Sequence, residues 1–187
     1  MAMPDLLRFW SREEVLALPD DGNRYELIDG ELLVSPSPRG RHQIAVWELA
    51  RLVDDYVRRH RVGRTGMAPA DLDLRTGQVS QPDLFVSRAV DGRRPVEWDE
   101  YGIPILIAEV LSPSTERYDR VVKRVRYQAS GVADYWIVDL DGRVVEQWAL
   151  GAEHPLVRSH TLEWRPDAAW PALVIDLPAY FESVWAE

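Results

Sequence analysis

Residues 103–111 read IPILIAEVL, a stretch in which Glu109 is the only charged residue. Polar and apolar positions do not alternate along it, which is typical of a strand that is buried on both faces of a sheet. We therefore predict a central strand over 103–111, flanked in the sheet by a strand at 78–86 (QVSQPDLFV). This pattern favours an α/β protein with a mixed central sheet and helices packed against it.

Helices and hairpins are expected on both sides of this strand. Helical spacing of apolar residues and capping signals predict a short helix capped by Ser11 and Glu14, and helices over 41–60, 115–130 and 177–185. Gly63 and Gly66 are interpreted as the break after the second of these helices. The turn pairs Asp29-Gly30 and Asp141-Gly142 indicate hairpins, so the further expected strands are 24–35 and 134–145 (two strands each), 70–74 and 154–164.

Length and composition indicate one soluble globular domain. The chain has 187 residues, of which 46% are hydrophobic, and we expect a single domain over 1–187. It contains no cysteine, which excludes disulfides, zinc–thiolate sites and thiol catalysis. No apolar run approaches the roughly 18 residues of a membrane span, and the N-terminus lacks the pattern of a secretory signal. The expected location is therefore the cytoplasm, away from any membrane.

The charge of the chain limits what it can bind. Its formal net charge is −9, which argues against a protein that coats nucleic acid non-specifically, because phosphate binding needs a basic surface. An enzyme that acts on nucleic acid is not excluded, since an acidic metal site and a basic rim can coexist.

Lysine is almost absent from the sequence. Lysine and arginine together number 22, and Lys123 is the single lysine, so arginine supplies the other 21 (22 − 1). Lysine offers a compact charge that can shift its pKa or hold a water, whereas arginine is a fixed planar fork. Lys123 can therefore mark a place where arginine does not serve, or it can be a chance survivor on a solvated helix face.

Two carboxylates stand among apolar neighbours. Asp83 precedes Leu84-Phe85-Val86, and Glu109 lies inside the central strand. Burying a carboxylate is costly unless it is paired, hydrogen-bonded or bound to a cation. A divalent cation such as Mg²⁺ prefers oxygen ligands and removes the repulsion between two such acids. The alternative is that each acid pairs with an arginine at a strand end.

The helix after Glu109 carries Asp119, Lys123 and Tyr127 at intervals of four residues, which places them on one stripe. One interpretation is an Asp119–Lys123 ion pair on the surface, worth about 0.3–0.5 kcal/mol. The other directs Lys123 at the end of the Glu109 strand, which the start of the helix closely follows.

The chain resembles a widespread bacterial family labelled "putative restriction endonuclease", within the PD-(D/E)XK nuclease superfamily. The resemblance rests on YELIDGEL (25–32), the helix start at His42 after SPSPRGR, QPDLFVS (81–87), IAEVLSPST (107–115), then Asp119, Lys123, Tyr127 and GVADYWIVD (131–139). It implies a restriction-endonuclease-like core of mixed sheet and helices.

The resemblance also implies roles for individual residues. It makes Asp83 and Glu109 the metal ligands, for Mg²⁺ or Mn²⁺, with the backbone carbonyl of Val110 as a further ligand. The superfamily motif has a lysine two residues after the second acid, where this chain has Leu111. Lys123 falls at the position of a migrated catalytic lysine. Glu31 and His42 also match family positions, which implies a third ligand or a water partner at the site. The alternatives are a hairpin charge beside Gly30 for Glu31 and a polar helix-start residue for His42. Asp119 and Tyr127 are expected to support the site.

Two functions follow as hypotheses. The first is a metal-dependent endonuclease that acts on nucleic acid, with DNA as the expected substrate and with Arg117, Arg120 and Arg124 near the site to hold phosphates. A homodimer or larger assembly is expected, with tryptophans covering the interface. The second is a nuclease-like fold that serves as an inactive binding or assembly module, which the net charge and the eight tryptophans favour. A phosphodiesterase that is not a nuclease is a further alternative.

Overall fold

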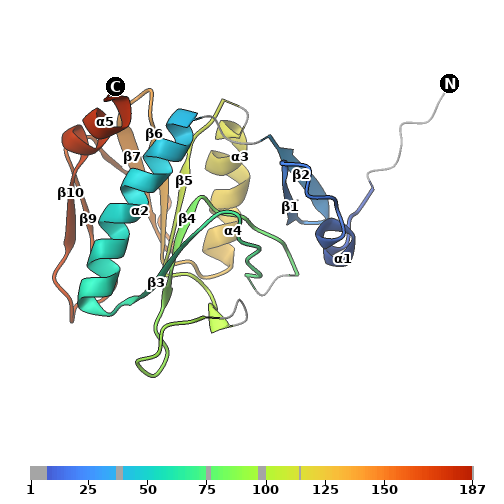
Figure 1. Ribbon diagram of the computed structural model, residues 1–187, viewed down its shortest axis with the longest axis horizontal. Helices are drawn as coiled ribbons and strands as arrows, with labels where there is room; N and C mark the ends of the chain where they lie inside the picture. Colours follow the sequence, from blue (N-terminus) through green and yellow to red (C-terminus); the bar gives the residue numbers. More distant parts are fainter. Residues whose placement is uncertain (1–7, 37–39, 75–76, 97–99, 114, 187) are drawn as a thin grey trace.

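A six-stranded mixed sheet forms the centre of the protein (Figure 1). The computed structural model describes residues 8–36, 40–74, 77–96, 100–113 and 115–186. The strands follow the order β3-β4-β5-β6-β7-β8 across the sheet. Their bounds are β3 Gly63–Met67, β4 Leu84–Arg88, β5 Leu106–Val110, β6 Asp134–Asp139, β7 Val144–Ala149 and β8 Leu156–Arg158.

Strand β5 is central, as its apolar sequence predicted. It pairs antiparallel with β4 on one side and parallel with β6 on the other, and all five of its residues are buried. The flanking strand is shorter than expected, because β4 begins at Leu84. The residues before it turn away, and Val79 and Ser80 form isolated bridges with Leu27 and Leu72. The expected strand at 70–74 is reduced to the second of these bridges.

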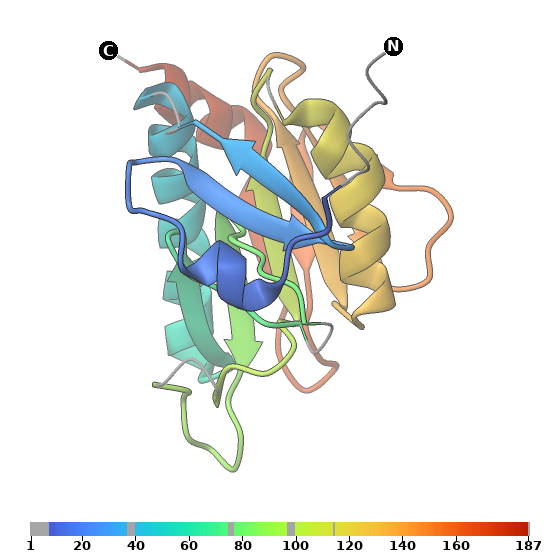
Figure 2. The same ribbon diagram turned by 90° about the vertical axis from the view of Figure 1, so that its right-hand side faces the viewer.

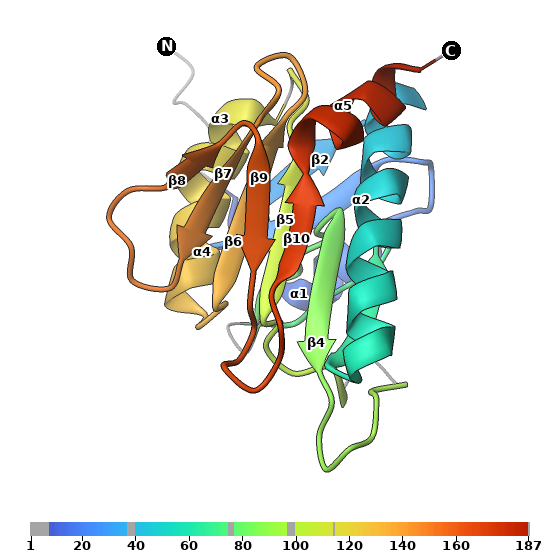
Figure 3. The same ribbon diagram turned by 90° about the vertical axis from the view of Figure 1, so that its left-hand side faces the viewer.

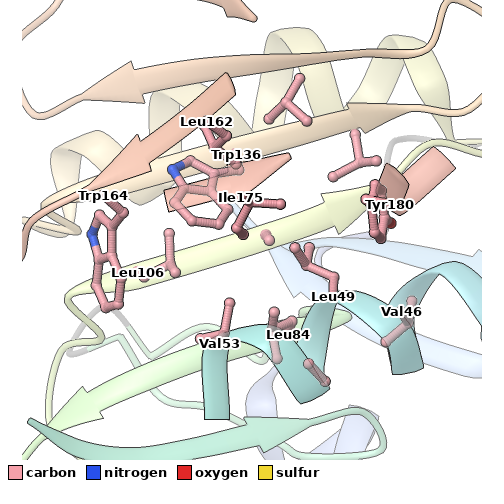
Figure 4. Packing of buried hydrophobic residues seen from close by; sticks show 14 of the residues in the cluster. Val46, Leu49, Val53, Leu84, Leu106, Trp136, Leu162, Trp164, Ile175 and Tyr180 are labelled. Atoms are coloured by element: carbon pink, nitrogen blue, oxygen red, sulfur yellow. The ribbon is translucent and has the colours of Figure 1, made fainter. Parts of the chain in front are cut away.

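One face of the sheet is covered by α2 (Gly40–His60), by the two-stranded sheet of β9 (Thr161–Trp164) and β10 (Leu173–Asp176), and by α5 (Leu177–Trp185) (Figure 3). Alternate strand residues, including Leu84, Leu106 and Trp136, point into this layer (Figure 4). The period of two in a strand explains why every second residue joins this core.

The opposite face carries the segment after β5 and an N-terminal hairpin (Figure 2). The hairpin consists of β1 (Arg24–Ile28) and β2 (Glu31–Ser35), and α1 (Arg12–Leu16) packs beside it. Strand residues of the other parity, including Phe85, Ile107 and Tyr135, point toward this side. By the same parity, Glu109 belongs to this face.

The helical segment after β5 is not a uniform α-helix. It runs as α3 (Glu116–Tyr118), a π-helical stretch η2 (Asp119–Lys123) and α4 (Arg124–Ala129). Short π segments inside α-helices occur frequently at functional sites. Asp119 and Lys123, the buried residues of η2, both face the sheet layer around Glu109.

Several boundaries differ from the sequence-based expectations. Gly63 and Gly66 lie inside β3, which was not predicted, and β10 was not predicted either. The expected strand at 154–164 divides into β8 and β9, which belong to different sheets. No described helix is both long and apolar enough to cross a bilayer.

Candidate active site

The sheet register brings the two predicted carboxylates together. Leu84 pairs with Ala108 at the end of the antiparallel β4–β5 ladder. One step further along, Asp83 lies across from Glu109, and its backbone N–H donates to Glu109 Oε2 at 3.3 Å. Each of these residues is only 2% exposed.

Asp83 is held by three donors. Its Oδ1 accepts from Arg24 Nη1 at 2.6 Å, and its Oδ2 accepts from the Val110 backbone N–H at 2.9 Å and lies 3.0 Å from His42 Nε2. Burial alone raises the pKa of Asp83, but the hydrogen bond and charge of His42 and the charge of Arg24 outweigh burial and lower that pKa to about 2. Asp83 is therefore ionised at neutral pH.

Lys123 lies among three buried acids, one of which is the second carboxylate, Glu109. Its Nζ lies 2.9 Å from Glu26 Oε2, 3.0 Å from Glu109 Oε1 and 3.4 Å from Asp119 Oδ1. Burial lowers the pKa of Lys123, yet the surrounding carboxylates reverse this and hold it well above its ordinary value. Burial raises the pKa of Glu109 well above its ordinary value, against the opposing charge of Lys123. Lys123 is 3% exposed, which excludes the alternative that it lies on a solvated helix face.

Two residues at the site were not predicted from the sequence. Glu26 is 2% exposed, contacts Lys123 and accepts from the Gln81 backbone N–H at 2.9 Å. Arg24 contacts Asp83 from the same strand. Their spacing of two in β1 places both side chains on one face of the hairpin, a signal that the sequence did contain.

The other predicted site residues fall in two groups. His42, Asp119 and Tyr127 join the cluster, since His42 contacts Asp83, Asp119 contacts Lys123, and the Tyr127 hydroxyl donates to Glu109 Oε1 at 3.0 Å. Glu31 lies at the start of β2 with an exposed side chain, opposite Ile28, whereas Glu26 of the partner strand is buried.

A cavity of about 750 Å³ opens onto the cluster. Its wall includes both predicted carboxylates and Lys123, together with Arg24, Glu26 and His42. Arg41 lies at the same cavity and stacks on the Trp185 ring, with 3.8 Å between the guanidinium carbon and the ring centroid. The cavity is thus bordered by the hairpin, the first turn of α2, the ends of β5 and β6, and the end of α5.

Comparisons with known proteins identify the family of the chain and support its fold. Residues 12–177 match the family described as "Putative restriction endonuclease" (Uma2). The chain belongs to this family. Its fold is also similar to that of a solved protein from Anabaena variabilis, described as a "putative nuclease belonging to DUF820", with a TM-score of 0.76 and 18% identity over 93% of this chain and 98% of the other. No curated protein matches the sequence.

The buried acids of this Uma2 protein are the candidate ligands for a divalent metal. Across the described ranges, no three His, Asp or Glu side chains stand in a ready metal-binding group. The acids are instead gathered around Arg24 and Lys123. Four buried acids (Glu26, Asp83, Glu109 and Asp119) nevertheless outnumber these two cations. This excess of oxygen donors fits a hard divalent cation.

The lone pairs of the two predicted ligands show where a metal can enter. Asp83 Oδ2 and Glu109 Oε1 each have two described partners, whereas Asp83 Oδ1 and Glu109 Oε2 each have one. A carboxylate oxygen accepts at about two positions. One oxygen of each acid therefore keeps a position for a metal.

The arginines expected to hold phosphates differ from one another. Arg120 pairs with Glu146 at 2.8 Å, with Asp139 at 3.0 Å and with Glu116, so its donors are engaged. Arg124 lies over the Trp148 ring, with its Nε bonded to the Arg120 carbonyl. Arg117 is exposed and has no ion pair in the described parts of the structure.

Proposed function

We propose that this Uma2 protein is a metal-dependent nuclease that hydrolyses phosphodiester bonds, with DNA as the expected substrate. The observation that supports this most directly is the convergence of Asp83, Glu109 and Lys123 at one open cavity. Three residues distant in sequence meet there at the cost of burying charge, which a purely structural role does not require.

Asp83 and Glu109 are the proposed ligands for Mg²⁺ or Mn²⁺, with the Val110 carbonyl as a third donor. When bound, such a cation activates water and offsets negative charge on a phosphate. The ionised state of Asp83 suits this role, since a carboxylate must be deprotonated to bind a metal. Burial raises the pKa of Glu109, so a metal would have to displace the proton that burial favours there. Lys123, fixed between Glu26 and Glu109, supplies a positive charge and a hydrogen-bond donor for the attacking water or the phosphate.

The module hypothesis keeps one supporting observation. Arg24 and Lys123 already compensate the buried acids, so the cluster can also tie the β1–β2 hairpin to the sheet without any metal. The two functions differ in whether the protein binds a divalent cation and cuts nucleic acid.

A titration calorimetry and cleavage experiment tests the proposal. The wild-type protein is expected to bind Mn²⁺, to melt at a higher temperature with metal because the native state alone binds it, and to cut DNA or RNA oligonucleotides. Asp83→Ala should lose metal binding and cleavage, because it removes one of the two acidic ligands.

The matched control is Asp71→Ala, which removes an exposed acid bonded to Gln81 outside the cavity. This variant should behave as the wild type does. Equal metal affinity in the wild type and Asp83→Ala would count decisively against the proposed site.

A further inference from the structure

Arg24 is paired with Oδ1 of Asp83, the oxygen that keeps a position for a metal. The other oxygen, Oδ2, already has His42 and the Val110 N–H as partners, while Oδ1 has Arg24 alone, at 2.6 Å. A guanidinium and a divalent cation cannot share this close position without strong repulsion. Metal binding at Asp83 therefore requires Arg24 to move.

The cavity offers space for the displaced Arg24 side chain. Its side chain is 20% exposed and lines the cavity, whereas Asp83, Glu109 and Lys123 are at most 4% exposed in their side chains. A guanidinium matches the geometry of a phosphate as well as that of a carboxylate, and it can bind either through two parallel hydrogen bonds. Among the described residues, the ion pair of Arg24 is the one with Asp83, although the charges of Glu109 and Glu26 also act on it.

From these observations we infer that Arg24 is an exchangeable cation, which neutralises Asp83 in the metal-free protein and binds a phosphate of the nucleic acid once metal replaces it. The inference rests on the proposed function and names its phosphate-binding residue. Metal and substrate binding are then coupled, because each metal ion that enters releases one guanidinium for the substrate.

The inference predicts opposite effects of one substitution. Arg24→Gln removes the competing charge but keeps an N–H donor for Asp83. Its affinity for Mn²⁺ should rise by about tenfold or more, because a nearby positive charge is lost. Its affinity for an oligonucleotide in the presence of metal should fall by about tenfold or more, the usual effect of losing a hydrogen bond to a charged group. Removing an arginine that merely ties the hairpin to the sheet would not lower the affinity for the oligonucleotide or the salt slope.

The experiment combines calorimetry with a salt series. Mn²⁺ binding is measured without nucleic acid, and binding of a fluorescent oligonucleotide is measured with Ca²⁺, a larger oxygen-ligated cation, over a range of salt concentrations. Loss of one phosphate contact should reduce the slope of log K against log[salt] by about 0.7–0.9. The matched control is Arg12→Gln, since Arg12 also links the N-terminal part to the chain, through the Gln78 carbonyl and Asp73, but does not line the cavity. It should leave metal affinity and salt slope unchanged.

The outcomes separate the two proposals. A wild-type protein and an Arg24→Gln variant that both fail to bind Mn²⁺ would overturn the proposed metal site, and the inference with it. Wild-type binding that Arg24→Gln weakens or leaves unchanged would overturn the inference alone. Mn²⁺ binding that is tighter in Arg24→Gln than in the wild type, together with weaker oligonucleotide binding, would support both. Binding by the variant alone would overturn the exchange, because metal would then not displace Arg24 in the wild type. If Arg24→Gln does not fold, Arg24→Lys serves instead, because it keeps the charge but loses the planar fork, and it should lower oligonucleotide affinity with little change in metal affinity.

Discussion

Lys123 is the residue on which the site most depends. A lysine with a 4% exposed side chain and carboxylates from Glu26, Glu109 and Asp119 within 3.4 Å is a buried charge network, not a surface ion pair. Breaking such a network by removing one partner typically costs about 3–5 kcal/mol. A conservative change that keeps the charge is therefore more informative than its deletion.

Lys123→Arg is expected to lower cleavage by about 10²-fold or more, the scale of losing one positioned hydrogen-bond donor to developing charge. The planar guanidinium is larger than the ammonium group and does not fit the compact position between Glu26 and Glu109. Because the site is fully buried, the larger head should also cost about 1–3 kcal/mol of stability. Turnover is measured on the variant after thermal melting shows that it is folded.

The control is the reverse exchange on the same helix, Arg126→Lys. Arg126 pairs with Asp29 and its side chain is 40% exposed, so cleavage should stay at the wild-type level. Wild-type turnover in Lys123→Arg would remove Lys123 from the reaction and leave it a structural role only.

Single residues also show what the sequence could and could not indicate. Asp83, Glu109 and Lys123 were predictable because each is a charge among apolar neighbours or the single lysine of the chain. Glu26 and Glu31 are both acids of the same hairpin, and their local sequence does not say which one turns inward. That choice depends on the face of β1 that packs toward η2, which is a tertiary contact.

At the scale of elements, a glycine can indicate either a helix break or a close approach of two strands, and the sequence does not distinguish the two. Gly63 and Gly66 were interpreted as a helix break, yet they also let β3 approach β4 closely. A Cβ at Gly63 would lie 1.8 Å from the Ser87 carbonyl oxygen, and one at Gly66 would lie 2.2 Å from the Phe85 ring. The predicted break does follow the end of α2. Because both glycines were assigned to that break, strand β3 was not predicted.

Gly63→Ala should destabilise the protein by about 3 kcal/mol, because the added methyl meets backbone and not a flexible side chain. The measurement is chemical denaturation followed by circular dichroism. Gly40→Ala is the matched control, since a Cβ at the start of α2 meets nothing within 4 Å, and its stability should change by about 1 kcal/mol or less. Equal effects of the two changes would mean that β3 can shift away from β4 at little cost.

Other element boundaries depended on partners far away in the chain. The segment 154–164 looks like one strand, but Leu156–Arg158 pairs with β7 and Thr161–Trp164 pairs with β10. Strand β10 has no signal of its own that distinguishes it from a loop before α5. The π-helical stretch also cannot be read from the stripe of Asp119, Lys123 and Tyr127, because an α-helix would give the same spacing.

At the scale of the whole molecule, the tryptophans serve mainly the core. Trp136 and Trp164 are almost completely buried and pack edge to face, with 6.0 Å between ring centroids. Trp47 is the only described tryptophan among the exposed large hydrophobic residues, at 59%. The number of tryptophans therefore gives little support to an interface. The remaining support for assembly comes from the exposed apolar residues of one helix.

That helix is α2, whose exposed side carries Ile44 and Trp47 three residues apart, at 46% and 59% exposure. The same helix begins at the cavity, with Arg41 and His42 in its first turn. A homodimer formed through this surface would therefore include the helix that borders the cavity. Light scattering should accordingly give twice the chain mass of 21.5 kDa.

Trp47→Glu should weaken the dimer by about tenfold or more, because a central tryptophan usually dominates an interface. Val174→Glu, a change at an equally exposed residue on β10, should leave it intact. A mass of 21.5 kDa at high protein concentration would overturn the assembly, and a dimer that is insensitive to Trp47→Glu would place its interface elsewhere.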